Sequence, residues 1–306
     1  MLCVMPNIVP VFIARIATLN HFADLFSFLL SSFPPFFPSQ SQDLNRNALL
    51  PEGRAEVLAR DPNVAGYFDF SDFLNPARPP SLVDAYLRIP AGAAYNIAAY
   101  GMLHLKRALV AAQYSFQAGI FYGGTELQSS HALLWAFLER FQNVKPGGRV
   151  TWVDVHTGLG SSGKDTLMVA GPAGFAEVLK WFPGADHVHC DHDDQQTDVG
   201  AGYDLTRGLI EELFKHRFTG TTGSDGGQHA HQLHFTQEFG TVPGFLVVRA
   251  MLLENQAFHH APAQHGYWSE FSRDAFYVRT SAWKAAVLAR GVAVAEQAIQ
   301  RSAAHA

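Results

Sequence analysis

The sequence predicts an α/β fold in which helices flank a central sheet. Two short β-rich runs, residues 148–155 and 232–239, are each followed closely by glycine, as buried strands that end in turns are. Segments with apolar residues at helical spacing surround these runs at 131–143, 174–181, 205–217, 244–258 and 280–299. Strands separated by helices are typical of a sheet covered on its faces by helices.

Composition narrows the class of protein. A chain of 306 residues with 48% hydrophobic and 16% charged residues is typical of a large folded domain. The net charge of -5 and the lack of a basic stripe give no reason to expect a nucleic-acid partner. Cys3 and Cys190 are the only cysteines, so we expect no disulfide framework, which favours a reducing compartment such as the cytoplasm.

The first 42 residues differ from the rest. They are apolar, with Arg15 and Asp24 as the only charged side chains, and Pro34, Pro35 and Pro38 interrupt the uncharged run at their end. A membrane helix needs about 20 uninterrupted apolar residues. A signal peptide has basic residues before its apolar run and a small-residue cleavage site after it, and neither is clear in this segment. We therefore expect no membrane partner. We also expect residues 61–95, rich in proline, aspartate and aromatic residues, to form a long surface excursion.

His156 follows the first β-rich run, in the sequence DVHTGLG at 154–160. Open α/β sheets bind ligands at strand ends, and imidazole is a common zinc ligand that a nearby carboxylate often orients. Asp154 lies two residues earlier and therefore on the same face of a strand. Two interpretations stay open: a metal ligand at His156, or a histidine that only caps the loop by hydrogen bonding.

Glu238 and the motif DLNRN at 43–47 are two further candidates. Glu238 interrupts an apolar strand just before a turn, so it is either a general base on a metal-bound water or the partner of an arginine at the sheet edge. Arg46 and Asn45 offer a guanidinium fork and an amide, which suit a carboxylate. The alternative is a loop that hydrogen-bonds to itself.

Three histidine-rich stretches carry the residue types of metal ligands without a ligand geometry. Residues 187–194 and 259–265 are predicted to be polar loops. His229, His231 and His234 precede Glu238, but His234 and Glu238 lie roughly 13 Å apart along a strand, too far for one metal ion. None of these stretches is therefore assigned a site.

Four motifs together resemble a known family. DLNRN at 43–47, QYSFQAGIFYGG at 113–124, DVHTGLG at 154–160 and QEFGT at 237–241 have the order and approximate spacing of a zinc carboxypeptidase-like family. This family, domain of unknown function 2817, is related to the metallocarboxypeptidases and the aspartoacylase-type deacylases. The resemblance covers about residues 43–299. It implies one α/β domain with a mixed central sheet, helices on both sides and one zinc ion at the strand ends.

The resemblance also implies roles for single residues. His156 matches the family's last zinc ligand, and Asp154 and Thr157 are supporting residues of the same motif. Glu238 matches the general base. The implied reaction is hydrolysis of an amide, in which zinc polarises the carbonyl and Glu238 takes a proton from the zinc-bound water.

Substrate recognition follows from the same resemblance. Arg46, with Asn45, matches the pair that grips a substrate carboxylate, so the implied substrate is a peptide or an N-acyl amino acid. Tyr122 matches a family loop to which the resemblance gives no definite role, and we include it as a supporting residue.

The chain departs from the family pattern before residue 43. The His-x-x-Glu motif that supplies two more zinc ligands is absent, and the nearest sequence, from His21 to Asp24, is His-x-x-Asp. The Phe-, Pro- and Ser-rich stretch before Asp43 resembles a translated pyrimidine-rich tract. We therefore expect residues 1–42 to be unrelated to the family, and the carboxypeptidase-like domain over 43–306 to lack its first strands.

Three functions stay open. The first is a zinc-dependent amide hydrolase with the substrate carboxylate held by Arg46. The second is a catalytically inactive remnant that lacks two zinc ligands. The third, which rests on residues 1–38 alone, is a membrane-anchored binding protein.

Overall fold

The computed structural model describes residues 2–4, 42–139, 149–190, 205–219 and 231–304. They form an α/β fold around a mixed sheet with the strand order β1-β2-β5-β3-β4, which confirms the predicted fold class. β2 is parallel to β5 and β3 to β4, whereas β1 with β2 and β3 with β5 are antiparallel. The strands are β1 Leu2–Val4, β2 Arg149–Ser162, β3 Asp165–Val169, β4 His187–Cys190 and β5 His231–Gly240.

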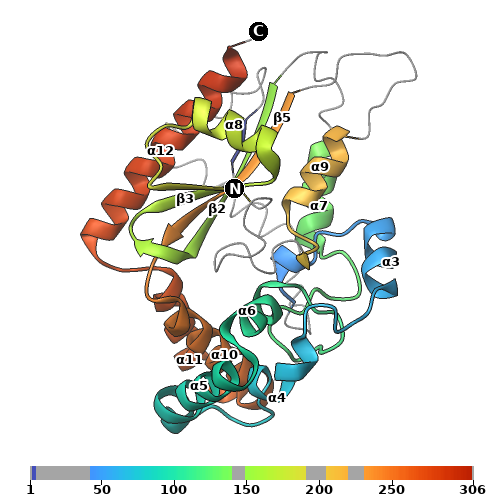
Figure 1. Ribbon diagram of the computed structural model, residues 1–306, viewed down its shortest axis with the longest axis vertical. Helices are drawn as coiled ribbons and strands as arrows, with labels where there is room; N and C mark the ends of the chain where they lie inside the picture. The colour runs from blue at the N-terminus through green and yellow to red at the C-terminus, as the bar shows by residue number, and fades with distance from the viewer. Residues whose placement is uncertain (1, 5–41, 140–148, 191–204, 220–230, 305–306) are drawn as a thin grey trace.

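Helices lie on both faces of the sheet and beyond the ends of its strands (Figure 1). The α-helices are α3 Pro51–Ala59, α4 Ser71–Leu74, α5 Ile89–Tyr100, α6 Met102–Val110, α7 Ser129–Glu139, α8 Gly171–Trp181, α9 Glu211–Thr219, α10 Gly244–His260, α11 His265–Phe276 and α12 Ser281–Ala303. The shorter helical segments are η1 Leu44–Arg46, η2 Tyr67–Phe70, η3 Asp84–Arg88, which is a π-helix, and η5 Pro262–Gln264. No helix of the described residues is long and apolar enough to cross a membrane.

The sheet buries apolar side chains on both faces, as the alternation of a strand requires. Val153 and Phe235 lie on one face, in a core shared with α8 and α12. Val150 and Trp152 lie on the opposite face, in a core shared with α7 and α9. Since side chains two residues apart share a face, Asp154 continues the face of Trp152 toward the strand end.

The helices below the strand ends in Figure 1 form a third core, which corrects our prediction for residues 61–95. We expected a surface excursion, but Tyr67, Phe70, Leu74 and Ile89 are buried in this core together with side chains of α6, α10 and α11. The prolines and aspartates that suggested a loop lie between or at the ends of short helices, where they are tolerated. This segment is therefore part of the folded domain.

Several other boundaries differ from the sequence prediction. β2 continues to Ser162 through the glycines that we predicted to form a tight loop, with an irregularity in register opposite Gly240. Residues 187–190 form β4 rather than a polar loop, and residues 191–194 lie outside the described residues. Residues 259–265 belong to the end of α10, to η5 and to the start of α11.

The remaining helix predictions are confirmed, and one starts later than expected. α8, α10 and α12 coincide with predicted segments, whereas α9 begins at Glu211 rather than at 205. α7 covers the first part of the predicted segment 131–143, whose residues 140–143 lie outside the described residues. Gly208, just before α9, has a φ of +76° that favours glycine and ends any helical path there. The stretch 5–41, which carries most of the predicted unrelated segment, lies outside the described residues. β1, from the segment that we expected to be unrelated to the domain, pairs with β2 at one edge of the sheet.

Candidate functional site

The last part of the regular parallel pairing between β2 and β5 places one imidazole beside two carboxylates. His156 and Glu238 are register partners on these parallel strands. Nε2 of His156 lies 2.8 Å from Oδ2 of Asp154, and Nδ1 lies 3.8 Å from Oε2 of Glu238. Oε1 of Glu238 accepts a hydrogen bond from the backbone N–H of Leu159 at 2.9 Å. Among the described residues no arginine pairs with Glu238, so that alternative is not supported.

The three side chains affect one another's protonation. Burial acts to lower the pKa of His156, but the hydrogen bond to Asp154 and the charges of Asp154 and Glu238 outweigh it and raise that pKa. Burial raises the pKa of Glu238, against the opposing effects of the Leu159 amide and the His156 charge. A carboxylate with a raised pKa is a better general base near neutral pH.

Arg46 and Asn45 are held in η1 by backbone contacts. Nη1 of Arg46 donates to the carbonyl of Asn45 and Nη2 to that of Val110, both at 2.7 Å. Oδ1 of Asn45 accepts from the backbone N–H of Ile210 at 3.0 Å, which orients the amide and leaves Nδ2 as its donor end. The backbone N–H of Asn45 donates to Oδ1 of Asp43. The DLNRN loop therefore hydrogen-bonds to itself, as one of the two interpretations held. The same contacts also fix the position of the Arg46 guanidinium.

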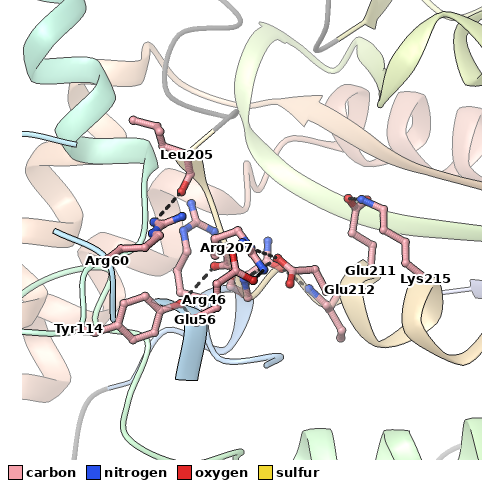
Figure 2. A network of polar contacts seen from close by, with 12 residues as sticks. Arg46, Glu56, Arg60, Tyr114, Leu205, Arg207, Glu211, Glu212 and Lys215 are labelled. Atoms are coloured by element: carbon pink, nitrogen blue, oxygen red, sulfur yellow. Dashed lines mark hydrogen bonds and ion pairs between the residues drawn. The ribbon is translucent and has the colours of Figure 1, made fainter. Parts of the chain in front are cut away.

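The QYSFQAGIFYGG motif at 113–124 contacts the backbone of Arg46. The Tyr114 hydroxyl donates to the backbone carbonyl of Arg46 at 2.8 Å, as Figure 2 shows. A Cβ at Gly123 would lie 2.2 Å from the Tyr114 ring and 2.5 Å from the Arg46 carbonyl oxygen, so no side chain fits there. Tyr122 is buried, and its carbonyl accepts from the N–H of Asp43 at 2.8 Å. This motif, whose role the sequence left open, positions η1.

A neighbouring arginine has a different environment. Arg207 donates to both carboxylate oxygens of Glu56 and lies 3.6 Å from Glu212 (Figure 2). The backbone N–H of Gly208 donates to Glu212 at 2.7 Å, and a Cβ at Gly208 would lie 2.2 Å from the Arg46 carbonyl oxygen. Arg207 is therefore neutralised by protein carboxylates, whereas Arg46 has no carboxylate partner among the described residues.

One cavity of about 610 Å³ connects these groups. Six of the residues that we predicted for the site line it: Asn45, Arg46, Asp154, His156, Thr157 and Glu238. Tyr122 does not line it. The structure thus brings together two segments separated by more than a hundred residues in the chain, since η1 and the strand ends face the same space.

Sequence reasoning missed two features of this cavity. The first is the Leu159 amide that binds Glu238, which depends on the path of β2 after His156. The second is an extensive apolar wall from α4, α5, α6 and α10. No local motif marks this wall, because its residues have the spacing of ordinary core helices.

The described residues supply donor types that zinc accepts, but not a complete zinc site. Imidazole and carboxylate are donor types that zinc accepts, but no group of three His, Cys, Asp or Glu side chains in the described residues is placed to hold a metal ion. Both ring nitrogens of His156 face carboxylates. His21 and Asp24 lie outside the described residues. The described residues therefore do not by themselves form a complete zinc site.

Comparison with known proteins gives one result. Residues 39–290 match the profile of a family described as "Protein of unknown function (DUF2817)". No curated protein matches the chain, and no solved structure matches it.

Proposed function

We propose, from the premise that this chain belongs to the DUF2817 family, that it is an amide hydrolase for peptides or N-acyl amino acids with a free carboxylate. The family description assigns no activity, so the proposal rests on the site. The link to carboxypeptidases rests on the resemblance of the four motifs.

The observation that carries the proposal is the position of Arg46. Its guanidinium is buried, lines the cavity, and has no carboxylate partner among the described residues. Two of its five N–H groups bind backbone carbonyls, and the Nε–H has no acceptor in the described residues. A buried charge without a counter-ion is costly. A ligand carboxylate in this cavity would neutralise it with bidentate geometry.

Glu238 is the group best placed to act on the scissile amide. It lines the same cavity as Arg46, and its raised pKa suits proton transfer. In the proposed reaction Glu238 takes a proton from the attacking water and passes it to the leaving nitrogen. Asp154 holds the His156 ring in place beside Glu238, since it binds Nε2.

Zinc is the cofactor that the resemblance implies. When bound, it would polarise the amide carbonyl and acidify the attacking water. His156 is the residue that the resemblance assigns to it. Because the described residues do not complete a zinc site, the proposed reaction uses protein groups alone.

The test is hydrolysis of a panel of N-acyl amino acids, followed by release of the free amine. We expect wild-type protein to turn over members of the panel, and Glu238→Gln to lower kcat by about 100-fold or more, the usual contribution of a general base. Turnover by Glu238→Gln at the wild-type rate would overturn the assignment.

A second function, a carboxylate-binding protein without catalysis, is favoured by the lack of a three-ligand group among the described residues. Amine release by purified protein, measured together with its zinc content, separates the two. About one zinc per chain, lost in His156→Ala, supports the hydrolase. Protein that binds the panel compounds, contains no zinc and releases no amine supports the binding protein.

A further inference from the structure

The wall of the cavity opposite the strand ends is apolar and helical. The strand ends and η1 contribute charged groups at one end, whereas α5, α6 and α10 contribute mainly hydrocarbon side chains together with two cations, Lys106 and Arg249. The hydrocarbon side chains include Ala93 and Ile97 of α5, Leu105 and Leu109 of α6, and Val248 and Met251 of α10. A cavity of about 610 Å³ with a charged end and an apolar wall suits an amphipathic ligand.

The helical wall also discriminates between kinds of apolar ligand. The backbone N–H and C=O groups inside a helix bind one another, so this wall offers few partners to the amides of an extended peptide. Peptide amides placed against it would lose their hydrogen bonds to water, which is costly. An alkyl chain has no such groups and gains from the same burial.

One polar side chain in this wall is already occupied. Arg249 lines the cavity, but its guanidinium lies over the rings of Tyr86 and Phe271, at 5.3 and 5.7 Å from their centroids. It also donates to the carbonyl of Ala85 at 3.4 Å. Its charge is therefore directed toward the rings of η3 and α11, although its Nε–H, like that of Arg46, has no acceptor among the described residues.

We propose that the ligand is an N-acyl amino acid with an unbranched acyl chain of medium to long length. The acyl chain lies along α5, α6 and α10, and the carboxylate lies at Arg46. This inference rests on the proposed function, because it takes the head-group position from it. It adds the class of acyl group, which the family description and the motifs leave open.

The experiment is calorimetric titration of Glu238→Gln protein, which prevents turnover, with N-acyl glycines of increasing chain length from acetyl to dodecanoyl. Each methylene buried contributes about 0.8 kcal/mol, so we expect Kd to fall about fourfold per added carbon until the chain fills the cavity. Kd should then level off.

A pair of neighbouring alanines provides matched variants in the same protein. Ala93 lines the cavity, whereas Ala94 is exposed on the same helix and does not. Ala93→Phe should move the levelling-off to shorter chains by several carbons, and Ala94→Phe should leave it where it was. If the two variants behave alike, the acyl chain does not lie along α5 and the inference is overturned.

The titration with N-acyl glycines of increasing chain length also separates this inference from the proposed function. If Kd is the same for acetyl and dodecanoyl glycine, the acyl-chain inference fails while carboxylate binding stands. If long-chain N-acyl glycinamides bind as tightly as the corresponding carboxylates, the acyl-chain inference is supported and the head-group role of Arg46 fails. If none of the compounds binds, both fail.

Discussion

Nδ1 of His156 lies 3.8 Å from Oε2 of Glu238, across the parallel pair β2 and β5. Nε2 of the same ring binds Asp154. Among the described residues, the buried Glu238 carboxylate is thus held by one backbone amide and one imidazole, and no arginine forms an ion pair with it. Such an arrangement is costly for the folded state, and this cost supports the proposed role of Glu238.

Replacement of Glu238 by Gln should therefore leave stability unchanged or increase it. The Gln side chain keeps an acceptor for the Leu159 amide and removes a charge that is largely buried. We expect a gain of about 0.5–2 kcal/mol in the free energy of unfolding, as for other active-site replacements. Urea denaturation measures it, with the exposed Glu270→Gln as a control that stays within about 0.5 kcal/mol of wild type. A loss of more than about 1 kcal/mol would identify Glu238 as a structural residue.

The ion pair between Asp165 and Arg290 should be important for stability. Nη2 of Arg290 lies 2.9 Å from Oδ2 of Asp165, which is buried and also accepts from Gln237. Arg290→Ala would leave that carboxylate buried with Gln237 as its one side-chain donor among the described residues, at a cost of about 3–5 kcal/mol in the free energy of unfolding.

The matched control for this pair is Arg279→Ala. It breaks the exposed pair of Arg279 with Asp274 and should leave the free energy of unfolding close to that of wild type, because solvent screens the pair. Equal losses in the two variants would show that burial of Asp165 does not make its ion pair more important.

Stability should fall in mild acid because of His234. Burial lowers the pKa of His234 to about 4, although the Glu211 carboxylate at 4.0 Å acts in the opposite direction and Lys215 acts with burial. The unfolded chain takes up this proton near its ordinary pKa of about 6.5. The folded state takes it up only at lower pH, so its stability is full above about pH 6.5 and declines as pH falls toward 4.

The size of this decline follows from the shift. A pKa lowered from 6.5 to about 4 corresponds to about 3 kcal/mol at the acid end. His234→Gln removes the titrating group, so its unfolding free energy should depend less on pH between 6.5 and 4 than that of wild type. The two pH profiles, measured by urea denaturation, would be parallel if His234 were not the cause.

Much of the fold could be predicted from the sequence, and its exceptions have physical reasons. The long periodic segments that became α10 and α12 were clear, because each buries one continuous stripe. β3 and β4 were missed since they are short, and His187 and His189 make β4 look polar. Their strand conformation depends on pairing with β5 and with each other, which local sequence does not record.

The candidate site also contains residues that the sequence predicts and residues that it does not. Motif residues such as His156, Glu238 and Arg46 could be selected because their types carry chemistry, and the structure places them around one cavity. The apolar wall could not be selected, because Ala93 or Val248 looks like any core residue until the helices pack. Gly123 was visible in the motif, but its role required the Tyr114 ring and the Arg46 carbonyl beside it.

The most direct test of the account is the preference of this cavity for a carboxylate over the matching carboxamide, measured as the ratio of their Kd values. We expect Glu238→Gln protein, in which turnover is prevented, to bind an N-acyl amino acid at least tenfold more tightly than its carboxamide, since a charge-assisted bidentate contact contributes about 1.5–3 kcal/mol. Arg46→Gln should abolish the preference. Arg207→Gln should keep it, because Arg207 does not line the cavity and pairs with Glu56. Equal affinities in that protein, or a preference that survives Arg46→Gln in the same background, would contradict the assignment of Arg46 as the carboxylate-binding residue.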